Sequence, residues 1–257
     1  MSNLEQQIIN YWNKNPCNIN HGKSNINSID FFNEVNIKRQ TAQPHIAKFA
    51  NYSQYNGKRV LEIGCGIGTD AEQFAKCNAD YTGIDISDRS IDICQKRFRL
   101  LNLPGKFFVR NAADDLNDLG KFDMVYCWGV LHHFPDPGKI LKNINKVLNI
   151  SGELKVMVYA KNSWKYAMIC NGLDQFEAAN NCPYADVYTK TQITNLLEKN
   201  QFTVRNISQD HCFMFDVPEY KNSNYVLLPW FEAMPEKVRR AVNKSLGWHL
   251  MINAEVK

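Results

Sequence analysis

The chain has 257 residues, of which 44% are hydrophobic and 22% are charged, and its net charge is +4 at pH 7. These values are typical of globular proteins and do not indicate a nucleic-acid-binding surface. No apolar run reaches the roughly 18 residues of a membrane span, so we expect no membrane association. The N-terminal residues lack a signal core, which predicts a cytoplasmic protein. Eight cysteines without a Cys-x-x-Cys pair favour reduced thiols and no metal site.

Residues 1–57 are predicted to form a helical extension, with helices over 4–13 and 29–52 that are separated by a polar loop. Asp30 is expected to cap the second helix, because a side-chain oxygen at that place accepts hydrogen bonds from free backbone N–H groups. Pro44 lacks an N–H group and clashes with the preceding turn, so we expect it to kink or divide this helix.

The chain then alternates between strands and helices. Strands are predicted near residues 58–63, 80–85, 106–110, 122–127, 152–159 and 202–208, and helices near 68–77, 88–101, 137–148 and 191–200. This alternation predicts a doubly wound α/β fold with a mostly parallel sheet. Residues 160–190 and 210–246 interrupt the alternation, and 247–255 read as a last strand. Open sheets of this kind bind ligands at the carboxyl ends of their strands, where the extension and both insertions are expected to form a cap.

The most specific pattern is a glycine turn that follows the first strand, Val60–Ile63. Gly64, Gly66 and Gly68 allow the backbone to turn tightly and to approach a ligand. The helix expected after them directs free N–H groups back at the turn. Asp85 lies 21 residues after Gly64, at a spacing typical of an acid that binds ribose hydroxyls. Together these features predict a site for a cofactor that contains adenosine.

Two residues distinguish between the cofactors that such a turn can hold. Thr69 stands where a dinucleotide-binding turn has a third glycine or an alanine. Glu62, two residues before the first glycine, would repel a pyrophosphate and would suit a cationic ligand. The pattern therefore argues against NAD and favours a cofactor with positive charge.

Four segments resemble, in chain order, the motifs of class I S-adenosylmethionine-dependent methyltransferases: Val60–Gly68, Ile84–Ser87, Asn111–Asp114 and Phe122–His133. Residues 148–154 stand where that family usually has a Leu-Lys-Pro-Gly-Gly turn, and they depart from it at 150 and 151. The resemblance covers about 58–159 and implies a single domain with a Rossmann-like, seven-stranded sheet whose last strand is antiparallel, between strands five and six. It also implies S-adenosylmethionine as cofactor and S-adenosylhomocysteine as product.

The resemblance implies a set of cofactor contacts. They are Glu62, Gly64, Cys65 and Gly66 around the methionine portion, Asp85 at the ribose, Ile86, Asn111 and Ala112 at the adenine, Trp128 at the amino group and Arg39 at the carboxylate. Plain structural roles remain open for four of them. Glu62 can be a helix-dipole or surface partner, Asp85 a helix N-cap, Trp128 a core residue and Arg39 an exposed arginine.

Methyl transfer is an in-line displacement, in which alignment and the exclusion of water can supply much of the catalysis. A hydroxyl acceptor needs a base in addition, and histidine is best matched to neutral pH. His133 follows strand four, Tyr159 ends strand five and His211 ends strand six, so these three are the candidate catalytic residues. Tyr159 and His211 can instead bind the acceptor or merely seal the cap, and His133 can be present without transferring a proton.

Residues 160–250 are rich in aromatic side chains, which either pack within the cap or enclose an apolar or cationic acceptor. They include Trp164, Tyr166, Phe176, Tyr184, Tyr188, Phe213, Phe215, Tyr220, Tyr225, Trp230, Phe231 and Trp248. We therefore expect a transferase that methylates a small molecule. An RNA or protein methyltransferase and a non-catalytic S-adenosylmethionine-binding protein are the alternatives. The oligomeric state and the accepting atom cannot be inferred from the sequence.

Overall fold

The computed structural model describes residues 3–174 and 182–257. Its seven strands form one sheet in the order β3-β2-β1-β4-β5-β7-β6. The strands are β1 Arg59–Ile63, β2 Asp80–Asp85, β3 Lys106–Val109, β4 Phe122–Trp128, β5 Leu148–Tyr159, β6 Phe202–Asp210 and β7 His249–Val256. The last strand runs antiparallel to both β5 and β6 and lies between them. The predicted fold and the predicted place of the last strand are confirmed.

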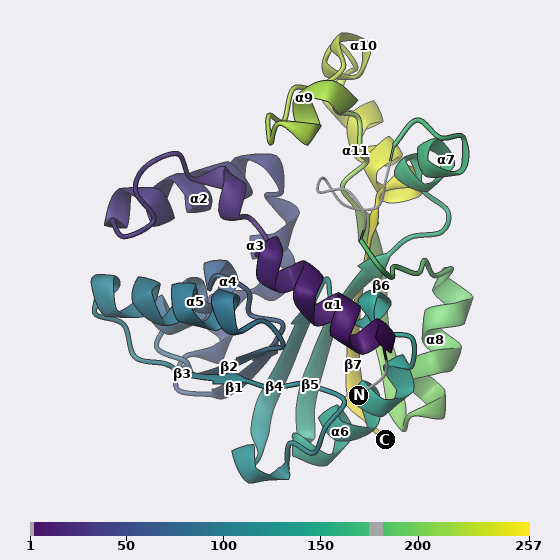
Figure 1. Cartoon of the computed structure of the whole chain (residues 1–257). Helices are drawn as coiled ribbons and strands as arrows, with labels where there is room; N and C mark the ends of the chain where they lie inside the picture. Colours follow the sequence, from purple (N-terminus) through teal and green to yellow (C-terminus); the bar gives the residue numbers. More distant parts are fainter. Residues whose placement is uncertain (1–2, 175–181) are drawn as a thin grey trace.

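Helices cover both faces of the sheet. They are α1 Asn3–Lys14, α2 Ile29–Ala42, α3 His45–Ala50, α4 Thr69–Lys76, α5 Asp88–Leu101, α6 Pro137–Val147, α7 Trp164–Cys170, α8 Lys190–Lys199, α9 Val217–Lys221, α10 Pro229–Glu232 and α11 Glu236–Leu246. In Figure 1, α2 lies at the upper left and α7, α9 and α10 lie at the upper right.

Two buried clusters attach the helices to the sheet. Successive strand residues point to opposite faces, so Val60 and Leu61 of β1 belong to different clusters. Leu61 packs in the cluster that α6 and α8 complete, and Val60 packs in the cluster that α4 and α5 complete. The core strands are buried on both faces, which explains their nearly continuous apolar sequences.

Several element boundaries differ from the prediction. Ser28, and not Asp30, caps α2, because its hydroxyl accepts the N–H of Phe31. The helix does break at Pro44, where α3 begins one residue later. Strand β5 begins at Leu148, four residues earlier than predicted, and pairs with Phe122 before a register shift.

The glycine turn between β1 and α4 adopts the left-handed backbone conformation that glycine tolerates. The φ angles of Gly64, Gly66 and Gly68 are 75°, 52° and 80°. A Cβ atom on Gly64 would lie 2.2 Å from the side chain of Val130, whereas one on Gly66 would meet no atom within 4 Å. Gly66 therefore faces open space beside the sheet.

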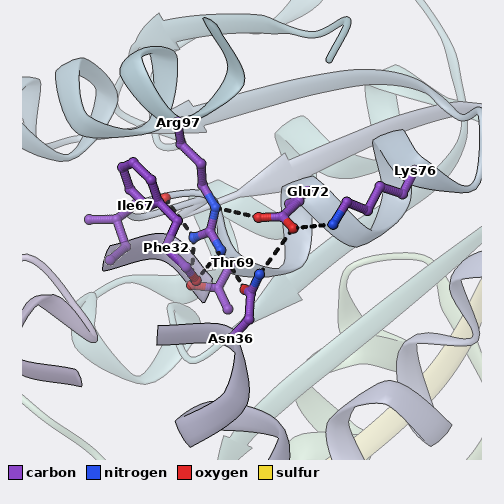
Figure 2. Close-up of polar contacts among 7 residues, drawn as sticks. All are labelled: Phe32, Asn36, Ile67, Thr69, Glu72, Lys76 and Arg97. Atoms are coloured by element: carbon purple, nitrogen blue, oxygen red, sulfur yellow. Dashed lines mark hydrogen bonds and ion pairs between the residues drawn. The ribbon is translucent and has the colours of Figure 1, made fainter. Parts of the chain in front are cut away.

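A buried ion pair connects α2, α4 and α5 behind this turn (Figure 2). The Nε of Arg97 donates to Glu72 at 2.6 Å, and both side chains are fully buried. Arg97 also donates to the backbone oxygen of Ile67 at 3.1 Å, inside the glycine turn. Asn36 of α2 bonds to both members of the pair. Each charge thus has several partners, as a buried charge requires.

We predict that Arg97→Met lowers the free energy of unfolding by about 3–5 kcal/mol, because it leaves the Glu72 carboxylate buried without its main partner. Urea unfolding at pH 7 measures this change. Arg240→Met is the matched control, because Arg240 and its partner Glu236 are both exposed, and its unfolding midpoint should stay the same. The double variant Arg97→Met, Glu72→Leu should recover part of the loss. An unchanged midpoint for Arg97→Met would contradict the assigned role of the pair.

Candidate functional site

One cavity lies at the carboxyl ends of the parallel strands β1, β2, β4 and β5. Residues of α1 and α2 and of the segments after β5 and β6 complete its walls. Twelve of the predicted site residues line it: Arg39, Glu62, Gly64, Cys65, Gly66, Asp85, Ile86, Ala112, Trp128, His133, Tyr159 and His211. Asn111 does not line it. The structure therefore brings together residues from seven separate parts of the sequence.

Asp85 is half-buried at the end of β2 and is tied to the glycine turn. One carboxylate oxygen accepts the N–H of Gly66 at 2.8 Å, and the other accepts the N–H of Ser87 at 2.8 Å. Desolvation raises the pKa of Asp85, although these N–H groups oppose the shift. Ser87, and not Asp85, caps α5 by accepting the N–H of Ser90. Each carboxylate oxygen keeps a lone pair for a ligand.

Glu62 is an acid in an apolar wall of the cavity. It is 3% exposed, and one of its oxygens accepts the hydroxyl of Tyr81. Desolvation raises the pKa of Glu62 well above its usual value, and the nearby charge of Asp70 raises it further. A cation placed beside this carboxylate would reverse that shift, whereas an anion would increase it. The electrostatics of this end of the cavity therefore favour a positively charged group.

Arg39 reaches the same end of the cavity from α2. It is 9% exposed, so it is not the exposed arginine that the sequence left open. Its Nη2 donates to Asp70 at 2.7 Å, and Asp70 also accepts the hydroxyl of Tyr52 at 2.8 Å. The Nε–H of Arg39 is buried without a hydrogen-bond partner among residues 3–174 and 182–257. Because Arg39 is one of the residues that line the cavity, this donor is a candidate partner for a ligand carboxylate.

The wall after β3 differs in one respect from the prediction. The side chain of Asn111 accepts the N–H of Ala113 at 2.9 Å, which closes a turn and accounts for the residue outside the cavity wall. Its neighbours Arg110 and Ala112 line the cavity instead. Arg110 was not predicted as a site residue, because the sequence places it at the end of the third predicted strand. In the structure it directly follows β3 and forms an ion pair with the exposed Asp118, as many surface arginines do.

The opposite end of the cavity is aromatic. Tyr159 stacks on Trp248 with ring centroids 4.2 Å apart, and His132 packs behind it at 3.7 Å. The Nδ1 of His133 lies 2.8 Å from the backbone oxygen of Tyr184. Because a carbonyl oxygen only accepts, Nδ1 of His133 carries the proton in this contact. The ring of Trp12 from α1 lies with its centroid 5.1 Å from that of His133 and covers this end of the cavity.

His211 lies just after β6 with a φ angle of 68°. Its ring stacks against that of His45 of α3, with centroids 5.1 Å apart, and against that of His249, the first residue of β7, with centroids 4.8 Å apart. His45 and His249 are not among the residues predicted for the site. The sequence did contain a signal for His249. The last strand was predicted to be antiparallel, which places its first residue beside the end of β5, and in the structure His249 pairs with Tyr159.

A buried lysine lies among the aromatic residues. Lys165 is 1% exposed and lines the cavity, and its ammonium group lies 3.9 Å from the ring centroid of Phe213 and 4.8 Å from that of Tyr220. Asp174 lies 3.8 Å from this ammonium group. Phe176, one of the predicted cap aromatics, lies outside the described residues. Most of the other predicted aromatics pack against one another.

Within the described ranges, no helix is both long enough and apolar enough to cross a membrane. All eight cysteines are free, as the sequence predicts.

Sequence comparison finds similarity to a curated methyltransferase over part of the chain. A ubiquinone biosynthesis O-methyltransferase from Coxiella burnetii (strain Dugway 5J108-111) is 31% identical over 110 residues, which are 43% of this chain and 47% of that protein. The match thus spans about half the length of this curated relative.

Two solved structures share the fold. Magnesium protoporphyrin IX methyltransferase from Synechocystis PCC 6803 with bound SAH has a TM-score of 0.63 and 17% identity, covering 98% of this chain and 100% of that one. The cyclase SpnF has a TM-score of 0.60 and 18% identity, covering 98% of this chain and 92% of that one. Finally, a family model described as a methyltransferase domain matches residues 32–207. Since this match spans more than half of the sequence, the chain belongs to the methyltransferase-domain family.

Proposed function

We propose that this protein transfers a methyl group from S-adenosylmethionine to a small-molecule acceptor and releases S-adenosylhomocysteine. The observation that carries the proposal is one cavity with a cofactor-like end and an aromatic end. We propose further that residues 1–257 act as a single domain. In it, 58–159 hold the cofactor, while 1–57, 160–190 and 210–246 cover the acceptor and 247–255 complete the sheet.

The residues at the cofactor-like end fit the chemistry of S-adenosylmethionine. Asp85 offers acceptor lone pairs to a ribose diol, and Gly66 leaves open space in front of the turn. Glu62 suits the cationic methionine portion, and the buried Nε–H of Arg39 suits its carboxylate. Ile86 and Ala112 offer an apolar surface to adenine. Trp128 lines the same cavity, and we propose that its backbone contacts the amino group. Bound S-adenosylmethionine supplies an electrophilic methyl group.

The other end of the cavity favours a small acceptor over RNA or protein. His21 of the N-terminal segment bonds to Tyr225 at 3.0 Å, which links that segment to the second insertion beside the cavity. Together with Trp12 against His133, this link encloses the space in which an acceptor would lie. An enclosed aromatic space suits a small ring system better than a polymer. Because Lys165 already presents a cation to Phe213 and Tyr220, a neutral or anionic acceptor is favoured over a cationic one.

A second candidate function is a reaction that uses this fold without methyl transfer. The similarity to the cyclase SpnF supports it, because that protein shares the fold and carries a different activity in its name. Fold similarity alone does not choose between the two functions. The curated relative, named as an O-methyltransferase, supports methyl transfer.

Incubation with radiolabelled S-adenosylmethionine and fractionated small-molecule extracts tests the proposal. Methyl transfer predicts a labelled product in at least one fraction, and less of it with Asp85→Asn when the cofactor is below saturation. Binding of S-adenosylhomocysteine together with no labelled product in any fraction would favour the second candidate. In a parallel incubation with cellular RNA and protein, label in either polymer, together with unlabelled small molecules, would overturn the choice of acceptor. Eight free cysteines support a reducing, cytoplasmic setting, so the extracts should be cytoplasmic and kept reduced.

We predict that Asp85→Asn weakens binding of S-adenosylhomocysteine by about 10- to 100-fold, because the amide no longer accepts two charge-assisted hydrogen bonds from the ribose. Isothermal titration calorimetry measures the affinity. Asp88→Asn is the matched control, because Asp88 is an exposed acid three residues along that does not line the cavity. Equal affinities for Asp85→Asn and the wild type would contradict the ribose assignment.

We also predict that binding of S-adenosylmethionine releases protons from Glu62. Its pKa is raised in the free protein, and the charged groups that face it are Asp70, Asp85 and Arg39. The cofactor's positive charge lowers this pKa, so the bound form holds fewer protons, and affinity rises with pH between the lowered pKa of the bound form and the raised pKa of the free form. Calorimetry in buffers with different ionisation enthalpies counts the protons. Glu62→Gln should abolish the release, and an unchanged count in this variant would exclude Glu62 as the source.

A further inference from the structure

Three histidines from distant parts of the chain meet at the aromatic end of the cavity. His45 belongs to α3, His211 follows β6, and His249 begins β7. His211 and His249 line the cavity, and both are less than 10% exposed. The ring centroids of His45 and His249 are 5.0 Å apart. The ring of Trp128, at the end of β4, lies edge-on to that of His249, with centroids 5.3 Å apart.

A hydrogen bond couples two of these rings. The Nε2 of His45 lies 2.8 Å from the Nδ1 of His249, so one of these nitrogens carries a proton and the other accepts it. In the described part of the chain, Nε2 of His249 has no hydrogen-bond partner. A proton on Nδ1 that is donated to His45 leaves the lone pair of His249 on Nε2. In this tautomer the pair has the form of a base with an orienting partner.

The surroundings keep the imidazoles uncharged at neutral pH. Burial lowers the pKa of His249 and of His211 well below the usual value, and burial lowers that of His45 to about 3. The charged and titratable groups that face the cluster from neighbouring elements are Arg39, His132 and Lys165, which act in the same direction. A neutral imidazole with a free lone pair can accept a proton from an acceptor. Among the described residues, no group of His, Cys, Asp or Glu side chains is arranged to hold a metal ion.

We propose that the methyl acceptor is a phenol-type hydroxyl, that His249 takes its proton, and that His45 positions His249. This inference rests on the proposed methyltransferase function. The stacked rings of Tyr159 and Trp248 beside His249 provide the surface on which a phenol ring would lie.

The step is balanced in charge and in atoms. The O–H bond of the acceptor breaks, and its proton goes to Nε2 of His249. An oxygen lone pair forms the new C–O bond, and the electrons of the breaking C–S bond go to the sulfonium sulfur. The site gains a positive charge on His249 as it loses the sulfonium charge, so the total charge does not change. The hydrogen bond from Nδ1–H to His45 stabilises the imidazolium, as the third group of a triad does.

The test uses 4-nitrocatechol, a phenol whose absorption spectrum changes on ionisation, bound to the full-length protein in the presence of S-adenosylhomocysteine. We expect the wild type to lower the ionisation midpoint of the bound probe by about one pH unit, which is a tenfold change in the ionisation constant. His249→Gln can still form hydrogen bonds but cannot take the proton, so it should return the midpoint to that of the free probe. Thermal unfolding of each variant controls for folding.

Two variants of His45 test its positioning role. His45→Gln retains an oxygen that accepts the Nδ1–H of His249, so it should keep most of the shift, whereas His45→Leu should lose it. Equal loss in both variants would contradict the positioning role. An unshifted or unbound probe in the wild type, or a shift that survives His249→Gln and disappears in His133→Gln, would overturn the proposal. Calorimetric titration with S-adenosylhomocysteine distinguishes failure of this inference from failure of the proposed function. If S-adenosylhomocysteine does not bind the wild type, the proposed function itself is contradicted.

Discussion

The buried contact between Arg97 and Glu72 is the interaction on which the site depends. Arg97 comes from α5 and Glu72 from α4, and the guanidinium also holds the backbone oxygen of Ile67 in the glycine turn. Asn36 joins α2 to the same pair (Figure 2). Removing two charges from water is costly unless each finds good partners, and this network supplies them. The cost is offset only when α2, α4 and α5 are all in place.

This constraint positions the cofactor-like end of the cavity. Asn36 and Arg39 are three residues apart on α2, so they lie on one face of the helix. The hydrogen bonds of Asn36 to Glu72 and Arg97 therefore also position Arg39, which contacts Asp70 and lines the cavity. On the other side of the turn, Asp85 holds the N–H of Gly66. The turn is thus fixed from behind by Arg97 and from the front by Asp85, which leaves Gly66 facing the space for a ligand.

Much of the fold could be predicted from the sequence because local patterns determine it. Alternating apolar strands and helices, a glycine turn and an acid at the end of the next strand lie close together in the chain. The contacts of Arg39, His45 and His249 could not be predicted this way, because they join residues more than 200 positions apart or depend on a long-range ion pair. Asn111 illustrates the reverse case. It follows β3, but its side chain closes a local turn and does not line the cavity.

We propose that this cavity accepts a cationic adenosine cofactor and excludes a dinucleotide. Calorimetric titration of the wild-type protein with S-adenosylmethionine and, separately, with NAD tests that claim most directly. The buried carboxylate of Glu62 beside the turn predicts binding of S-adenosylmethionine at one site per chain and no measurable heat with NAD. Competition between the two ligands, or binding of NAD alone, would contradict it.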